Sequence, residues 1–340
     1  MTDAAAPPGR RGLRLPGPTV PQERVVVGWP TMKRIDAWRG HLGAARDAVA
    51  IVVRTIAELE PVLVVAEVGE GRAAAGWIGD GVEVVELPMD DAWLRDTGPV
   101  VLTDADGGRA AVHFGFDAWG GRHDDYTLDA ALGGALADHL GLAPERAPFV
   151  LEAGAVTATA DGTVITTASC LLDPARNGAV DAATVEAWFA DWLGAARVVW
   201  LPSGLADDRA GGHVTNLVAV GGDGRILLQT TTDASDADHH AAAAARTALA
   251  DAGLEVVELD VLPHVACFDA TVEVPYVNLH VGNAGVFVPL GGAAADGEML
   301  DRIADCFPGR QVVGVPGTVL AYGGGGVHTL TCPIPAGSAD

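Results

Sequence analysis

Two kinds of apolar spacing alternate along the chain. Short apolar runs bounded by Gly, Pro or Asp predict strands, and longer stretches with apolar residues three or four positions apart predict helices. The predicted strands cover 24–30, 62–68, 82–87, 197–201, 217–220, 226–229, 256–262 and 311–315. The predicted helices cover 36–60, 126–141, 180–195, 236–252 and 297–306. Further strand pairs are predicted at 100–103 with 110–116, 149–156 with 163–167, and 276–280 with 286–289.

The order of these elements indicates the architecture. A strand, a helix, a strand and a hairpin recur about every 60 residues, which is typical of repeat folds built from one supersecondary unit. Five such ββαβ-type units fill the chain. This order predicts an α/β ring of small sheets with helices outside, whose strand ends converge on a central cleft. We expect residues 1–21 to be a disordered leader, and residues 22–340 to be one catalytic domain.

Composition narrows the class of partner. The formal net charge is −24, which argues against nucleic acid and against an anionic membrane surface, because both require clustered cations. It is compatible with a small cationic ligand, and solubility alone would also explain it. No apolar run approaches the roughly 20 residues that cross a bilayer. The four cysteines show no CxxC spacing and no signal peptide accompanies them, so we expect a cytoplasmic protein with reduced thiols.

A glycine run near the C-terminus is the first candidate site. Gly323–Gly326 precede His328, Thr329 and Cys332, and residues 327–331 have the composition of a strand. Four residues without a Cβ allow a sharp turn and close approach by another group. A reactive histidine beside a hydroxyl and a thiol is one interpretation, and a turn into a last core strand is the other.

An acidic segment at a strand end is the second candidate. Asp90, Asp91 and Asp96 lie within seven residues, together with Trp93 and Arg95. The carboxylates could bind a cation, with the indole as a pocket wall. The alternative is an Asp-rich turn in which Arg95 forms a salt bridge.

Several motifs, in order along most of the chain, resemble the agmatine deiminase group of the guanidino-group-modifying (pentein) superfamily, which includes peptidylarginine deiminase-like proteins. They lie at 27–30, 90–99, 117–121, 166–177, 200–205, 212–214, 277–278, 312–316 and 323–328. The resemblance implies a five-bladed α/β propeller with its site at the centre. It also implies a cysteine thiolate that attacks a guanidinium carbon, two carboxylates that hold the cation, and a histidine that moves protons.

The resemblance assigns roles to particular residues. Asp96 corresponds to the first carboxylate and His213 to the proton-moving histidine. Glu152 lies in a Glu-Ala-Gly version of the family's Glu-Gly-Gly motif. Trp93 is implied to line the pocket. Four further residues are expected to line or contact the site, namely Asp90, Trp119, Thr215 and His328.

Two positions depart from the family pattern. Where the family has Gly-His-Val-Asp-Asn, this chain has Thr215 in place of the second carboxylate. Where the family has Gly-Gly-Gly-x-x-His-Cys, this chain has Thr329 in place of the nucleophile. Loss of both groups predicts a changed substrate or a changed chemistry, since a lone carboxylate holds a guanidinium less well.

Two residues are alternative nucleophiles. Thr329 would need a positioned base and an orienting group, and the sequence supplies no third group. Cys332 is an odd number of positions away, so in a regular strand its side chain faces the opposite side unless a bulge intervenes. Metal binding by His213 and His328 lacks the usual spacing, and no metal or cofactor is expected.

Three hypotheses follow. The first is an enzyme acting on a small guanidino, amidino or amine compound through Asp96 and His213, without a cysteine. The second is an agmatine or guanidine deiminase that uses Cys332. The third is a non-catalytic ligand-binding pentein. The composition is compatible with a homodimer in each case.

Overall fold

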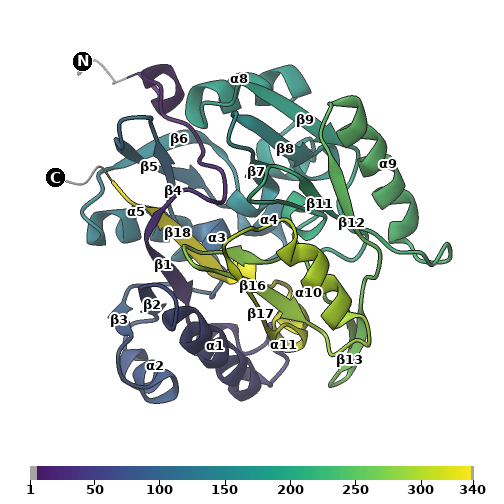
Figure 1. Ribbon diagram of the computed structural model, residues 1–340. Helices are drawn as coiled ribbons and strands as arrows, with labels where there is room; N and C mark the ends of the chain where they lie inside the picture. The colour runs from purple at the N-terminus through teal and green to yellow at the C-terminus, as the bar shows by residue number, and fades with distance from the viewer. Residues whose placement is uncertain (1–5, 338–340) are drawn as a thin grey trace.

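The computed structural model describes residues 6–337, whose strands form several small sheets rather than one large sheet. Five of these sheets share one connectivity. Two strands pair antiparallel, a helix follows, and a third strand then pairs in parallel with the second. This is the predicted ββαβ unit, and its fivefold recurrence forms the ring of sheets with outer helices in Figure 1.

The first blade joins the two ends of the chain. It contains β18 (Thr331–Pro335), β1 (Gln22–Gly28), β2 (Val62–Ala66) and β3 (Glu83–Glu86), with α1 (Leu42–Ala57) and α2 (Gly71–Ile78) as connections. β18 pairs antiparallel with β1, so that Val26 lies opposite Cys332. This pairing closes the ring and brings the described ends of the chain to one side of the molecule (Figure 1).

The other four blades follow in chain order, each with its helix between the second and third strands. The second has β4 (Val100–Thr103), β5 (Arg109–Gly115), α5 (Asp129–His139) and β6 (Pro144–Val150). The third has β7 (Val156–Ala158), β8 (Thr163–Thr167), α8 (Ala182–Trp192) and β9 (Arg197–Leu201). The fourth has β10 (Val218–Val220), β11 (Ile226–Gln229), α9 (Asp238–Asp251) and β12 (Val256–Leu259). The fifth has β15 (His280–Val281), β16 (Gly285–Leu290), α10 (Asp296–Ala304) and β17 (Gln311–Pro316).

The remaining elements are short. A separate hairpin consists of β13 (His264–Cys267) and β14 (Ala270–Glu273). The single-turn helices are η1 (Pro8–Arg11), η2 (Met32–Arg34), α3 (Leu94–Thr97), α4 (Ala118–Gly121), η3 (Ala153–Ala155), α6 (Ala168–Leu171), α7 (Pro174–Asn177), η4 (Val214–Asn216), α11 (Thr318–Gly323) and α12 (Val327–Leu330). In the described part of the chain, no helix is both long and apolar enough to span a membrane.

Strand β1 shows why the blades hold together. Its residues Val25, Val26 and Val27 are all fully buried. Val25 and Val27 pack beneath α1, whereas Val26 faces the neighbouring blade and Cys332. A strand buried on both faces needs a continuous apolar run. That run is the signal by which the sequence predicted it.

Five predictions differ from the structure. The predicted strand 149–156 is instead the end of β6, the turn η3 and the start of β7, and of the predicted strand 276–280 only His280 lies in a strand, β15. Helix α1 begins at Leu42 rather than at residue 36, because Arg39 and Gly40 adopt left-handed backbone angles that interrupt a helix. Residues 327–330 form the helical turn α12, where a strand was expected from residue 327, and the strand β18 begins only at Thr331.

The last difference concerns the leader. The sequence predicted disorder over residues 1–21, and the structure instead packs residues 6–21 against the propeller. Arg10 forms an ion pair with Asp191 at 2.6 Å, Leu13 is buried, and the backbone of Arg14 pairs with that of Thr103. Residues 1–5 lie outside the described residues. The packed part of the leader becomes important for a second cavity, described below.

Candidate active site

Short helical turns at strand ends bring the candidate residues together. Asp96 lies on α3, Glu152 directly precedes η3, and His213 directly precedes η4. α3 contacts both η3 and α12, and η3 contacts η4. Because each turn belongs to a different blade, the fivefold ring gathers at its centre residues that lie far apart in the sequence.

Asp96, Glu152 and His213 form a compact buried cluster. Nδ1 of His213 lies 3.9 Å from Oδ1 of Asp96, and its Nε2 lies 3.9 Å from Oε2 of Glu152. The imidazole therefore lies between two carboxylates. A Cβ at Gly154 would lie 2.5 Å from Nδ1 of His213 and 2.7 Å from Oδ1 of Asp96. Position 154 must be glycine for these side chains to meet.

Buried charges in the cluster compensate one another. Burial disfavours ionisation of Glu152, but the neighbouring His213 and Arg176 outweigh it and lower the pKa of Glu152 to about 2. Nε of Arg176 lies 3.1 Å from both Glu152 oxygens. Burial alone would lower the pKa of His213. The charges of Asp96 and Glu152 outweigh this effect, so the pKa lies above its ordinary value. The cluster is therefore suited to hold a proton on the imidazole.

Asp96 is fixed by two donors. Nε1 of Trp119 donates to Oδ2 at 3.0 Å, and the backbone N–H of Gly154 donates to Oδ1 at 3.1 Å. Ala118 and Trp119 adopt left-handed backbone angles, with φ of 59° and 58°. Such angles are unfavourable for residues with a Cβ. Here the strained turn aims the indole at the carboxylate. Burial nevertheless raises the pKa of Asp96.

An aromatic wall stands beside Thr329. Trp93 packs against Trp38, with ring centroids 5.6 Å apart. A Cβ at Gly325 would lie 2.5 Å from the Trp93 ring and 3.0 Å from Cβ of Thr329. The glycine run therefore admits the indole beside Thr329.

Thr329 and Thr215 both have hydrogen-bond partners. Oγ1 of Thr329 accepts from Nδ2 of Asn278 at 3.0 Å and from the N–H of Gly326 at 3.3 Å. Oγ1 of Thr215 donates to the carbonyl of Gly154 at 2.9 Å. Within residues 6–337, no imidazole or carboxylate is hydrogen-bonded to the hydroxyl of Thr329. The geometry therefore supplies no base to activate it.

Cys332 lies away from the carboxylate cluster. It is buried on β18 among aliphatic side chains, and its Sγ donates to the carbonyl of Pro99 at 3.4 Å. Burial raises the pKa of this thiol to about 11. Cys332 and His328 line a different cavity, whose walls do not include Asp96, Glu152 or His213.

The carboxylate of Asp90 accepts hydrogen bonds from the backbone. Its Oδ2 accepts the N–H groups of Leu128 and Asp129 at the start of α5, at 3.0 and 3.3 Å. Asp129 in turn accepts the N–H groups of Asp90 and Asp91. These reciprocal bonds tie the acidic loop to the helix. They explain the carboxylate-rich segment without a ligand at Asp90.

Three residues of the site have supporting roles that residue spacing did not reveal. Arg176 neutralises Glu152, Asn278 holds Thr329, and Asp208 accepts the backbone N–H groups of Gly212 and His213. Each lies far along the chain from its partner or is an ordinary loop polar residue. Only the family-like segments that contain Arg176 and Asn278 gave any signal.

A metal does not suit the cluster. Ligand atoms of Glu152, Cys170 and His213 lie within 4.8 Å of one another. Both Glu152 oxygens are bonded by Arg176, and burial raises the pKa of the Cys170 thiol well above its ordinary value. A protonated thiol and a carboxylate already paired with an arginine are poor ligands.

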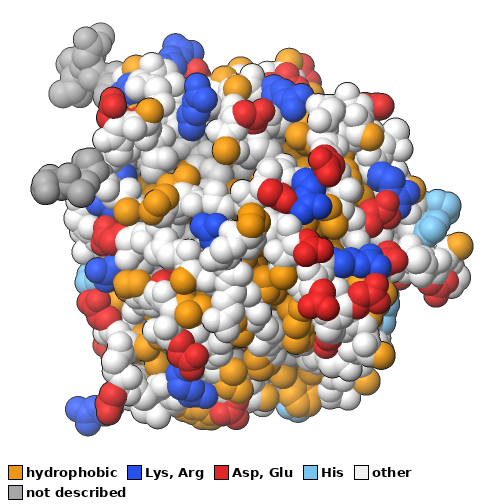
Figure 2. Space-filling view, viewed as in Figure 1, with side chains coloured by type: hydrophobic (Ala, Val, Ile, Leu, Met, Phe, Trp, Pro, Cys, Tyr) orange, Lys and Arg blue, Asp and Glu red, His pale blue; other side chains and the backbone are white. Residues whose placement is uncertain are grey.

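A cleft of about 340 Å³ lies beside the glycine run. Its charged lining consists of Asp207, Asp208 and Glu273 with Arg39 and Arg209. Burial and then the neighbouring carboxylates raise the pKa of Glu273 to about 7. On the face shown in Figure 2, acidic and basic side chains are interspersed, with no continuous basic patch.

The fold and sequence match known proteins along nearly the whole chain. Solved structures include an agmatine deiminase of Enterococcus faecalis, with a TM-score of 0.92, 27% identity and 98% of each chain covered. A Porphyromonas gingivalis protein, provisionally titled an arginine deiminase, gives a TM-score of 0.84 at 27% identity, over 95% of this chain and 98% of its own.

Curated relatives agree with the structures. A Vibrio parahaemolyticus protein with the provisional name agmatine deiminase is 32% identical over 356 residues, covering 97% of this chain and 98% of its own. A Yersinia pseudotuberculosis protein with the same provisional name is 30% identical, with 97% of each chain covered. The sequence profile of the Porphyromonas-type peptidyl-arginine deiminase family matches residues 14–335. The chain therefore belongs to this family, within the agmatine deiminase group of the pentein fold.

Proposed function

We propose that the chain binds a small guanidino, amidino or amine cation at the buried cluster and acts on it by acid–base chemistry, without a cysteine nucleophile. The observation that carries this proposal is the buried cluster of Asp96, Glu152 and His213, in which the imidazole lies between two carboxylates. Asp96 would face the cation, and His213 would move protons. A buried charge cluster is costly to keep unless a ligand uses it.

The substrate class is supported from two sides. The relatives and structures named above are agmatine or arginine deiminases by name, and agmatine and arginine both carry a guanidinium. The cleft beside Gly325 contains three carboxylates, Asp207, Asp208 and Glu273, against two arginines, Arg39 and Arg209, and this small acidic excess would favour a cationic tail. Trp93 offers an aromatic face to a planar cation.

Thiol chemistry is the weaker candidate. Cys332 has a pKa of about 11, so the thiolate is scarce at neutral pH, and the residue lines another cavity. A non-catalytic binding protein is the second candidate function. The observation that favours it is that Asp96 and Thr329 already have two hydrogen-bond donors each.

The test incubates the full chain with agmatine, arginine and simple amidines. Binding is measured by calorimetry, product by ammonia release and chromatography, and covalent adducts by intact mass. We expect binding that D96N abolishes, and product without any adduct or any sensitivity to thiol alkylation. Binding without product would establish the binding-protein alternative. Ammonia together with an adduct on Cys332 would refute the proposal.

A further inference from the structure

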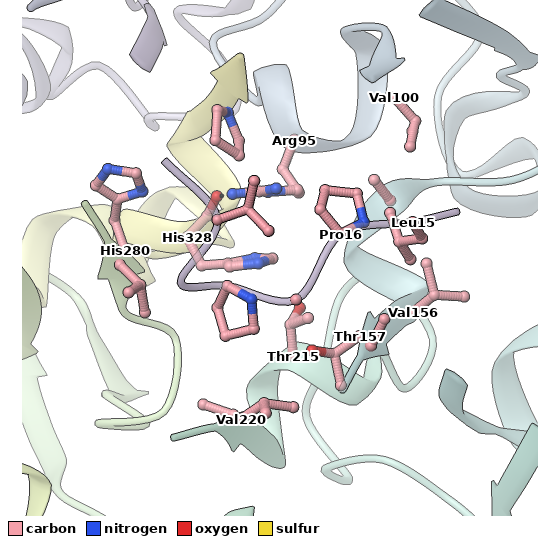
Figure 3. Close-up of a pocket in the computed structure, with 18 of the residues that line it drawn as sticks. Leu15, Pro16, Arg95, Val100, Val156, Thr157, Thr215, Val220, His280 and His328 are labelled. Atoms are coloured by element: carbon pink, nitrogen blue, oxygen red, sulfur yellow. Dashed lines mark hydrogen bonds between the residues drawn. The ribbon is translucent and has the colours of Figure 1, made fainter. Parts of the chain in front are cut away.

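A second cavity, of about 130 Å³, lies beside the central turns. Arg95, Ala153 and Thr215 line it, whereas Asp96, Glu152 and His213 do not. Each of these three lining residues is one or two positions from a cluster residue. The cavity therefore lies close to α3, η3 and η4, although the cluster side chains do not line it. Residues 15–18 of the packed leader, with Val20 and Gln22, form part of the wall, and Figure 3 shows this segment crossing the cavity.

Arg95 brings an unbalanced positive charge to this cavity. Its only hydrogen bond among residues 6–337 runs from Nε to the carbonyl of His328, at 3.3 Å. No carboxylate of the described residues forms an ion pair with it, contrary to the salt bridge considered from the sequence. Burial lowers the pKa of Arg95 to about 10, so the guanidinium remains charged at neutral pH. Its two terminal amino groups are left for another partner.

The other titratable groups of the wall do not supply a counter-charge. Burial and then Arg95 lower the pKa of His328 well below its ordinary value, and its Nδ1 is buried without a hydrogen-bond partner among the described residues. Cys332 is a neutral thiol at pH 7, since its pKa is about 11. His280 is already paired through Nε2 with Glu60 at 2.8 Å. The cavity therefore combines a cation with an unsatisfied imidazole nitrogen.

The remaining wall is aliphatic. It consists mainly of Leu15, Val100, Val156, Val218, Val220 and Leu279. Figure 3 shows Arg95 and His328 on one side of the cavity and Val156 and Val220 on another. An apolar cavity of about 150 Å³ holds a benzene-sized molecule, so this one suits a chain of about four to six carbons.

We propose that this cavity binds a short aliphatic monocarboxylate. The carboxylate bonds the terminal amino groups of Arg95, a charge-assisted and bidentate contact. The hydrocarbon chain lies against the valines and the leader segment. This site lies apart from the proposed active site and does not depend on what that site does.

The test measures thermal stability and calorimetric affinity of the full chain with pentanoate. Pentan-1-ol, pentylamine and sodium chloride at equal ionic strength are the ligand controls. We expect a saturable rise in Tm with pentanoate, a smaller one with pentan-1-ol, and none with pentylamine or chloride. R95Q should weaken pentanoate binding about tenfold or more, because a charged hydrogen-bonding partner is lost.

Two further variants serve as a control and as a second test of the proposed site. R72Q removes an exposed arginine elsewhere and should leave pentanoate binding unchanged. V220F fills the apolar side while keeping Arg95, and should abolish binding even if R95Q does not fold. The proposal is overturned if pentanoate does not stabilise the protein, if chloride stabilises it equally, or if binding survives in V220F.

Discussion

The ionisation of Glu152 depends on its neighbours. Alone, a buried carboxylate would take up a proton to avoid the desolvation cost. With Arg176 at 3.1 Å and His213 nearby, it stays ionised, with a pKa of about 2 instead of 4.5. The same ion pair therefore sets the charge of the proposed active site and contributes to folding stability.

E152Q should destabilise the protein at pH 7 by about 3–5 kcal/mol, because it leaves Arg176 buried without its counter-ion. Urea unfolding followed by circular dichroism measures the loss. D191N is the matched control, since it breaks the exposed ion pair with Arg10 and should cost little. A loss in E152Q no larger than in D191N would show that the buried pair does not stabilise the fold.

The stability of the wild type should also depend on pH through Glu152. Because its folded pKa is below 4.5, its stabilising effect is complete above pH 4.5 and falls as the pH drops towards 2. The difference in unfolding free energy between wild type and E152Q should therefore shrink below pH 4.5, by up to about 3 kcal/mol. A difference that stays constant from pH 7 to pH 3 would contradict the assigned shift.

A thiol at position 329 tests whether the cluster can support covalent chemistry. The resemblance found in the sequence implies that Thr329 occupies the position of the family's nucleophilic cysteine. If the cleft accepts agmatine, T329C should therefore release ammonia and show a covalent adduct by mass spectrometry. T331C places a thiol two positions away and should show neither. Failure of T329C to bind agmatine would mean that the cleft takes another substrate.

Among the elements, the glycine run preceding α12 has the tightest steric demand. A Cβ at Gly325 would overlap the Trp93 ring at 2.5 Å. G325A should therefore lower Tm and weaken ligand binding, since the indole must move from Thr329. G76A is the control, because Gly76 lies in α2 with open space around it, and alanine there should stabilise by about 0.5–1 kcal/mol. A G325A variant as stable as wild type would argue against this packing.

The elements also show what a sequence reveals about this fold. Continuous apolar runs such as Val25–Val27 and the helical spacing in α1 predicted the blades, because burial imposes those patterns. The sequence did not predict α2 or the β13–β14 hairpin. Their short, partly exposed segments carry weak periodicity. The turn α12 was taken for a strand, because Thr and Val favour strands and only packing against Trp93 and Asn278 selects the helical turn.

The sequence predicted the candidate site only in part, for a related reason. Motif resemblance identified Asp96, Glu152 and His213, and the structure places them in one cluster. Partners such as Arg176, and the isolated position of Arg95, depend on the three-dimensional arrangement of separate blades. Of two consecutive residues on one short turn, Arg95 lines the second cavity and Asp96 does not, and no spacing rule for a strand or a long helix describes such a turn.

At the scale of the whole molecule, the ring is closed by the pairing of β18 with β1, which lie at opposite ends of the chain. Val26 lies directly opposite Cys332 in this antiparallel pair, and both pack into the same cluster. Opposed residues of this kind have a Cα separation of about 4.5–5.5 Å, within the range of about 4.4–6.8 Å that a disulfide spans. V26C should therefore form a disulfide with Cys332 under mild oxidation.

That disulfide would link almost the entire chain into one loop. In the chain-entropy account it should stabilise the folded ring by up to about 5 kcal/mol, seen as a higher Tm for the oxidised than for the reduced variant. V27C is the control, since Thr331 lies opposite it and no disulfide can form there. Peptide mapping confirms the bond. If the thiol at position 26 instead pairs with another cysteine, or with none, the register of the closing strands is wrong. If the correct bond forms without raising Tm, separation of β18 from β1 is not part of the unfolding that heat produces.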